Sequence, residues 1–312
     1  MANLNLKHIH LIVNPASGMV EPILPTVNEV WTTAGLSYEV LVTQPGQDGT
    51  TLAHTAVADN AELIAVYGGD GTVREVASVL AGGDIPLAVL PGGTTNVVAQ
   101  QLGVPLNLKA AAQLITAPTS LVKHIDMGTI NDDHRFLLRA TIGLTTKMIA
   151  DTSAQDKERF GRGAYILSFL RQLPQMTGDE YTLYLDDETV TLRGVMCIIA
   201  NCGEVGVFDL RWAAGAEIDD GLLDVIVVGE QATALATAAI NLLGQQTVEP
   251  KSPTQPLLPE EHIHHWRVKR VRVETATAVA LQIDGDLLDL KTPVTVTIDH
   301  QTLPVLVPRA SA

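Results

Sequence analysis

The sequence predicts an α/β domain with a parallel sheet, followed by a β-rich, sandwich-like domain. In the first third of the chain, short apolar strands alternate with single helices, which is typical of βαβ units with right-handed crossovers. After about Thr119, strand patterns follow one another with turns between them. The chain has 312 residues, more than one hydrophobic core usually serves. We therefore expect one domain over residues 1–122 and another over 123–301.

The first domain is expected to contain strands and helices in strict alternation. The strands are short apolar runs that stop at Asn-Pro, Thr, Gly-Gly or Pro-Gly: residues 9–13, 38–42, 63–67 and 87–90. The helices have apolar residues at helical spacing: residues 23–31, 52–58, 73–80 and a further one from Asn96. Gly35 is a stop signal for the first helix.

The second domain is expected to be built from hairpins. Its strands are rich in Val, Ile, Leu and Thr: residues 122–130, 136–142, 181–185, 190–199, 222–228, 265–273, 279–283 and 294–298. Residues 186–188 are polar and predict a hairpin turn. Helices are predicted at 164–173 and 232–243, and residues 246–261, with four prolines, form an exposed linker or long loop.

Composition excludes several classes of protein. Lys and Arg number 20 against 35 Asp and Glu, a formal net charge of −15, which argues against a nucleic-acid binder. Two cysteines, Cys197 and Cys202, cannot form a disulfide framework and are expected to be reduced thiols. No run approaches the roughly 20 apolar residues of a membrane span, and the N-terminus lacks the apolar core of a signal peptide. A cytoplasmic protein is expected.

Three glycine-rich turns follow strands of the first domain. They are Asn-Pro-Ala-Ser-Gly at 14–18, Gly-Gly-Asp-Gly-Thr at 68–72 and Pro-Gly-Gly-Thr-Thr-Asn at 91–96. Ligands of open parallel sheets bind at the carboxyl ends of the strands, where glycine lets backbone N–H groups approach a phosphate. A single such turn is explained equally well by the sterics of βα connections. Three together favour a nucleotide or polyphosphate site, so the α/β domain is expected to bind a nucleotide.

Asp70 lies inside the second of these turns. A carboxylate beside phosphates is repulsive unless it binds a metal ion or accepts a proton, so Asp70 is a candidate for either role. The alternative is a cap for the helix that begins near Thr72. The sequence contains neither a GxxxxGK[ST] motif nor the motif set of protein kinases, which excludes both of these classes.

The turns at 14–18, 68–72 and 93–96 resemble those of the diacylglycerol kinase catalytic-domain family, which includes bacterial soluble lipid kinases and the sphingosine and ceramide kinases. NAD kinases share the Gly-Gly-Asp-Gly-Thr pentapeptide. The resemblance becomes specific through four later motifs in the same order: Asp-Met-Gly at 126–128, Asn-Cys-Gly at 201–203, Asp-Asp-Gly-Leu-Leu-Asp at 219–224 and Ile-Asp-Gly-Asp at 283–286.

This resemblance implies a nucleotide domain and a β-sandwich lipid domain with ATP between them. It also implies that a last strand, within residues 302–312, returns to the first domain. By resemblance the ATP site is lined by residues of the three turns and of one strand end: Asn14, Pro15, Ala16, Ser17, Gly18, Thr43, Gly69, Asp70, Gly71, Thr72, Val73, Arg74, Glu75 and Thr94. Thr43 taken alone is an ordinary strand end.

The same resemblance implies a catalytic base and a structural Mg²⁺ site in the second domain. The base would be Asp286, at a position where the family usually has Glu. The Mg²⁺ ligands would be Glu217, Asp220 and the backbone carbonyl of Leu222, hard oxygen donors of the kind this ion prefers. Without the resemblance, a solvated turn before a strand is the favoured interpretation of these residues.

The resemblance implies an ATP- and Mg²⁺-dependent lipid kinase that converts diacylglycerol to phosphatidic acid. The enzyme would be peripheral to the membrane, without a transmembrane segment, and a homodimer is conceivable. Two alternatives stay open: an NAD kinase, and a weakly active nucleotide- or lipid-binding protein on a kinase scaffold, which Asp286 in place of Glu suggests.

Two further sequence features each allow two interpretations. Arg159, Arg162 and Arg171 flank an apolar stretch that fits either an interfacial membrane helix or a helix over a core. His262, His264 and His265 form a histidine cluster in a basic segment, for which an exposed strand is favoured over a zinc site.

Overall fold

A computed structural model describes residues 6–17, 22–143, 178–202, 217–230 and 263–309 of the chain. The chain forms two compact units, one of Met1–Met127 with Asp299–Ala312 and one of Gly128–Ile298. Two strands, β5 (Ser120–Ile130) and β15 (Val294–Pro308), contribute residues to both units. The expected helices at 164–173 and 232–243 and the expected linker at 246–261 lie outside the described residues.

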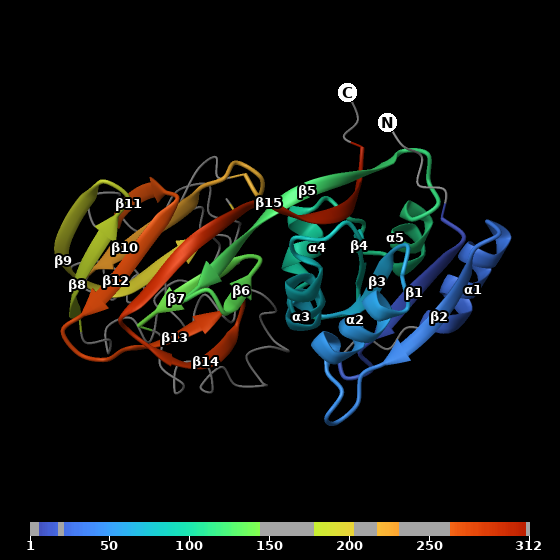
Figure 1. The fold of residues 1–312 in the computed structure, drawn as a ribbon, viewed down its shortest axis with the longest axis horizontal. Coiled ribbons are helices and arrows are strands. Elements are labelled where there is room, and N and C mark those ends of the chain that lie inside the picture. Colours follow the sequence, from blue (N-terminus) through green and yellow to red (C-terminus); the bar gives the residue numbers. More distant parts are fainter. Residues whose placement is uncertain (1–5, 18–21, 144–177, 203–216, 231–262, 310–312) are drawn as a thin grey trace, which may run out of the picture. The chain divides into compact units, whose positions relative to one another are not determined.

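The first unit is the expected α/β fold (Figure 1). Strands and helices alternate along it: β1 (His8–Val13), α1 (Ile23–Thr33), β2 (Ser37–Val42), α2 (Gly49–Ala58), β3 (Ile64–Gly68), α3 (Asp70–Leu80), β4 (Leu87–Pro91), α4 (Val97–Gln101) and α5 (Leu108–Leu114). The strands pair in parallel in the order β4-β3-β1-β2. Val305 of β15 pairs with Leu87 in parallel, which adds one more strand beside β4.

Burial explains why these strands are continuous apolar runs. Every residue of β3 and β4 is buried, as expected for central strands covered on both faces by helices. Trp31 of α1 is fully buried, packs edge-on against Tyr38, and donates a hydrogen bond from Nε1 to the carbonyl oxygen of Ala112 at 3.0 Å. This one side chain therefore joins α1 to β2 and to α5.

The strand order reverses at β1. The chain moves from β1 outward to β2 and then returns to β3 on the other side of β1. Right-handed crossovers then place α1 on one face of the sheet and α2 on the other. The connections that follow the paired carboxyl ends of β1 and β3 therefore leave to opposite faces of the sheet, and this is the position where open α/β sheets bind their ligands.

The second unit is β-rich, as expected. Its strands are β6 (His134–Phe136), β7 (Arg139–Ile142), β8 (Asp179–Leu185), β9 (Glu188–Ala200), β10 (Leu223–Gly229), β11 (Ile263–Val268), β12 (Arg270–Thr275), β13 (Ala280–Ile283) and β14 (Asp286–Lys291). The pairings among them are antiparallel. The core is mostly aliphatic and includes Cys197, whose burial raises the pKa of the thiol to about 12, so that the thiol is protonated at neutral pH.

Two strands that the sequence predicts as continuous are interrupted, each by a carboxylate. The run 136–142 breaks after Phe136 because the N–H groups of Leu137 and Leu138 donate to Asp284. The run 265–273 breaks at Lys269, where Asp186 accepts from the N–H groups of residues 269 and 270. In both places a side chain takes backbone donors that a regular ladder would use.

Helix α2 offers a test of helix capping. Asp48 is its N-cap and accepts hydrogen bonds from N and Oγ1 of Thr51, both at 2.9 Å, which hold the pKa of Asp48 below its ordinary value. We expect Asp48→Ala to lower the free energy of unfolding by about 1 kcal/mol at pH 7. Because the folded-state pKa is depressed, this contribution is present above the unfolded pKa and is lost as the pH falls through the folded value.

Urea unfolding of the wild type and Asp48→Ala at pH 7 and at pH 3 measures this difference. Asp48→Asn is the control, since an amide oxygen also caps and should keep most of the stability at pH 7. An equal loss for Asp48→Ala at both pH values would contradict a contribution from the carboxylate charge.

Candidate functional site

Asn14 joins the turn after β1 to the first turn of α3. Its Nδ2 donates to Oγ1 of Thr72 at 2.8 Å, and its Oδ1 accepts from the N–H of Ala16 at 2.9 Å. Ser17 Oγ donates to the carbonyl oxygen of Asn14 at 2.8 Å. The structure therefore brings two of the three predicted glycine-rich turns together at the carboxyl ends of β1 and β3. Gly18, also predicted here, lies outside the described residues.

The second and third turns touch through their backbones. A Cβ atom on Gly93 would lie 2.6 Å from Cα of Gly69, and one on Gly92 would lie 2.8 Å from the Tyr67 ring. No side chain fits at such distances, so close approach of the two turns requires glycine. Asn96, with a positive φ of 48°, closes the third turn by accepting from the N–H of Gly93 at 2.8 Å.

Asp70 connects the same two turns through hydrogen bonds. Its Oδ2 accepts from Thr95 Oγ1 at 2.9 Å and from the N–H of Val97 at 3.1 Å, while Oδ1 accepts from the N–H of Val98 at 2.9 Å. The alternative interpretation from the sequence, that Asp70 caps the helix beginning near Thr72, is wrong. Asp70 is the first residue of α3, but its side chain caps the N-terminus of α4. The negative charge of Asp70 is favourable at the N-terminus of α4.

The remaining predicted nucleotide residues have different degrees of access. Thr94 is exposed and Gly71 and Arg74 are half-buried, whereas the side chain of Val73 is buried in the inner face of α3. Glu75 accepts from the N–H of Gly49 at 2.9 Å and so braces the start of α2.

Two predicted positions add little to the side-chain lining of these turns. Thr43 donates its N–H to the carbonyl oxygen of Val13 at 2.9 Å, which fixes the end of β2 beside the end of β1. Pro15 is exposed in the first turn. A ligand at these turns would therefore meet the side chains of Asn14 and Thr94 more readily than those of the buried Thr72 and Val73.

The Asp-Gly turn of the second unit is a hairpin between β13 and β14. Asp284 and Gly285 both have positive φ, 47° and 104°, as a two-residue type I′ turn requires. The carboxylate of Asp284 accepts from the N–H groups of Leu137, Leu138 and Arg139 at 2.8, 2.9 and 2.9 Å. Asp286, the predicted base, is the exposed first residue of β14. Asp284 therefore anchors the hairpin to residues 137–139, whereas the side chain of Asp286 is accessible to solvent.

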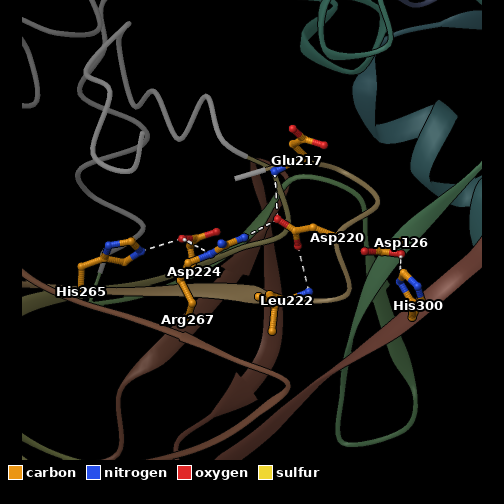
Figure 2. Close-up of polar contacts among 8 residues, drawn as sticks. All are labelled: Asp126, Glu217, Asp220, Leu222, Asp224, His265, Arg267 and His300. Carbon is orange, nitrogen blue, oxygen red and sulfur yellow. Dashed lines mark hydrogen bonds and ion pairs between the residues drawn. The ribbon is translucent and has the colours of Figure 1, made fainter. Parts of the chain in front are cut away.

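The acidic turn before β10 is centred on Asp220 (Figure 2). Its carboxylate accepts from the N–H groups of Glu217 and Leu222 at 3.1 and 3.0 Å, and it pairs with the guanidinium of Arg267. The donors proposed for Mg²⁺, two carboxylates and a carbonyl, suit a hard cation. However, Arg267 already supplies positive charge to Asp220, so Mg²⁺ would compete with this ion pair. The metal assignment therefore stays a prediction.

Asp220→Ala tests this prediction. If Asp220 binds Mg²⁺, the variant should lose activity and need more Mg²⁺ for half-maximal turnover, because a charged ligand is gone. Arg267→Met is the matched control, since it removes the competing cation and should lower the Mg²⁺ requirement. Mg²⁺ titrations that coincide for the wild type and Asp220→Ala would show that the turn holds no metal ion that matters for activity.

Two further acids anchor strands in the structure, a role the sequence patterns did not reveal. Buried Asp126 accepts from the N–H of Gln301 at 2.6 Å and lies 2.8 Å from His300, which ties β5 to β15. In the second unit, buried Asp224 lies 2.6 Å from Nε2 of His265. A lone acid within an apolar strand pattern is the signal that could have identified both.

Comparisons with known proteins agree with this arrangement. Residues 8–130 match the diacylglycerol kinase catalytic domain, and residues 142–307 match the YegS C-terminal NAD kinase beta sandwich-like domain. A "Probable lipid kinase YegS-like" of Pseudomonas aeruginosa is 30% identical over 82% of this chain and 80% of its own. The chain belongs to the diacylglycerol kinase family of lipid kinases.

Other members of this lipid kinase family cover nearly the whole chain. The diacylglycerol kinase of Bacillus subtilis is 28% identical over 90% of both proteins. A crystal structure from Bacillus anthracis matches at a TM-score of 0.78, with 26% identity and 98% of each chain covered. A second structure from that organism, of a diacylglycerol kinase, has a TM-score of 0.72 at 24% identity and supports the fold. The protein is accordingly a kinase-type phosphotransferase.

Within the residues that the structure describes, no helix is long and apolar enough to span a bilayer. The segment with Arg159, Arg162 and Arg171, a candidate interfacial helix, lies outside those residues. Of the histidine cluster, His262 is also outside them, while His264 stacks on Trp266 and His265 is held by Asp224. The described part of the cluster therefore fits the exposed strand favoured by the sequence.

Proposed function

We propose that this lipid kinase transfers the γ-phosphoryl group of ATP, with Mg²⁺, to the hydroxyl group of diacylglycerol and yields phosphatidic acid. The observation that carries the proposal is the convergence of three glycine-rich turns at the carboxyl ends of β1, β3 and β4, with Asn14 and Asp70 linking them. Diacylglycerol as acceptor is supported by the names of the relatives from Bacillus and Staphylococcus.

The chain's own residues would act mainly by positioning. Backbone N–H groups, that of Thr72 among them, and the side chains of Asn14 and Thr94 would hold the phosphates, and Asp286 would accept the proton that the attacking hydroxyl loses. As the hydroxyl oxygen bonds to the γ-phosphorus, the bond to the β,γ-bridging oxygen breaks and ADP leaves. Mg²⁺, when bound, would neutralise phosphate charge, and Asp70 offers a carboxylate for it.

The acceptor would be met at a membrane surface, with the protein bound peripherally. The formal net charge of −15 makes broad electrostatic attraction to anionic lipid unfavourable. Apolar contacts would therefore have to contribute to docking. Vesicle binding measured with neutral and with anionic lipids would reveal this preference.

Two alternative functions, an NAD kinase and a nucleotide-binding protein, are distinguished from a lipid kinase by assay. An NAD kinase would share the pentapeptide at 68–72 but would use a soluble dinucleotide as acceptor. A binding protein on the same scaffold would hold ATP without turnover, and Asp286 in place of the family's usual Glu motivates this alternative. Neither accounts for relatives named as lipid kinases.

The experiment is a radiolabelled ATP assay of the full chain with detergent-dispersed lipids. Acceptors are diacylglycerol, monoacylglycerol, ceramide, sphingosine and a polyprenol, with NAD as a soluble control. We expect Mg²⁺-dependent labelling that is highest with diacylglycerol. Labelling of NAD alone would support the dinucleotide kinase, and saturable ATP binding without labelling of any acceptor would support the binding protein.

A further inference from the structure

Two histidines and a carboxylate meet on one face of the first two strands. His8 and His10 are two residues apart on β1 and so point to the same side of the sheet. In the parallel register His8 is opposite Ser37 and His10 is opposite Glu39. One potential ligand atom from each of His8, His10 and Glu39 lies within 4.8 Å of the others. Among the residues described, no other three His, Cys, Asp or Glu side chains meet this criterion.

His10 is the unusual member of this cluster. Its residue is 2% exposed, and neither ring nitrogen has a hydrogen-bond partner among the described residues. Its Nε2 lies 3.9 Å from Oε2 of Glu39, too far for a hydrogen bond. Burying two unpaired polar atoms is costly unless they have a ligand.

A metal ion bound to His10 would offset the cost of burying an unpaired ring nitrogen. Tetrahedral bonds of about 2.0–2.1 Å place two ligand atoms roughly 3.3 Å apart, so the 3.9 Å separation needs to shrink only slightly. The side chain of Glu39 is 53% exposed and has room to make this adjustment. A direct hydrogen bond between Nε2 of His10 and Oε2 of Glu39 would need an even shorter separation than a shared metal ion does.

His8 is already oriented for metal binding by Ser37. The Ser37 hydroxyl donates its single hydrogen to the carbonyl oxygen of Lys7 at 2.9 Å. Its contact with Nδ1 of His8, at 2.8 Å, must therefore be one in which Nδ1–H donates. This fixes the tautomer and leaves the lone pair on Nε2, which is the arrangement that outer-shell partners impose on metal-binding histidines.

We propose that His8, His10 and Glu39 bind a transition-metal dication, for which Zn²⁺ is the representative probe, with a fourth position open to water. Imidazole ligands favour Zn²⁺ and similar ions over Mg²⁺, so the site is distinct in chemistry from any that serves ATP. His8 begins β1 and Asn14 follows its end, which separates the site from the glycine-rich turns by about 20 Å along the strand. The ion would fasten the edge strand β2 to β1.

The test is a Zn²⁺ titration of the metal-stripped full chain in excess Mg²⁺, read by competition with a chromophoric chelator. We expect one saturable equivalent, and with Co²⁺ the visible absorption of a low-coordinate site with nitrogen ligands. Glu39→Gln and His8→Gln should each weaken Zn²⁺ binding by about a hundredfold or more, and Ser37→Ala by about 10- to 100-fold.

The matched control is His264→Gln in the other histidine-rich segment, which should leave Zn²⁺ affinity unchanged. Zn²⁺ should also raise the melting temperature of the wild type but not of Glu39→Gln, a readout that needs no kinase activity. Since His10 is buried, the exposed Glu39 carries the test if His10→Gln fails to fold. The proposal is overturned if no saturable Zn²⁺ binding occurs, if Glu39→Gln and His8→Gln bind as the wild type does, or if His264→Gln removes the binding.

Discussion

Asp286→Asn should lower phosphoryl transfer to the best lipid acceptor by about a hundredfold or more, the scale for loss of a positioned proton acceptor. The side chain is exposed at the first residue of β14, and the hairpin before it is formed by Asp284 and Gly285. We therefore expect an unchanged melting temperature and ATP affinity within a few-fold of the wild type. Initial rates with labelled ATP, together with thermal unfolding and nucleotide titration, measure all three quantities.

Asp284→Asn is the matched control, two residues earlier in the same hairpin. Its carboxylate accepts three backbone N–H groups, so this variant should unfold at a lower temperature. Asp286→Glu then distinguishes two kinds of site. A site built for the shorter acid should lose activity with the longer side chain, whereas a degenerate site should gain activity. Full turnover by Asp286→Asn would eliminate Asp286 as the base.

Sequence periodicity was sufficient for the fold because local patterns and tertiary structure agree. The buried runs of β3 and β4 and the hairpin between β8 and β9 lie where the sequence predicts them. The helix expected from Asn96 is present as α4, whereas α5 was not predicted. Gly103, with a φ of 67°, ends α4, and α5 begins only at Leu108. The glycine was visible in the sequence, but its backbone conformation was not.

The candidate site was predictable as a set of turns but not as a set of contacts. Asp70 is bonded to groups 25 to 28 residues away, and Asp284 to N–H groups 145 to 147 residues away. No local pattern encodes such partners. The His8 and His10 pair was likewise missed, although alternation on a strand places both on one face. Only the register with β2 brings Glu39 to them.

Asp70→Asn should both destabilise the protein and lower phosphoryl transfer by about a hundredfold or more. The carboxylate accepts from Thr95, Val97 and Val98, whereas an amide offers one acceptor atom and turns an N–H₂ group toward the remaining donors. Losing a charged acceptor for these partly buried donors costs about 1–3 kcal/mol. The melting temperature should fall by about 2–4 °C for each kcal/mol.

Thr95→Val separates the two effects, because it removes one hydrogen bond to Asp70 and keeps the charge. Its melting temperature should fall less, and its turnover should stay within a few-fold of the wild type. Both variants are compared at a temperature where circular dichroism shows them folded, so that a rate difference reports chemistry and not unfolding. If the Asp70 charge binds Mg²⁺ or accepts a proton, Asp70→Asn should stay inactive at the temperature where it is folded. If its turnover recovers to that of Thr95→Val, Asp70 acts solely as the brace between the second glycine-rich turn and α4.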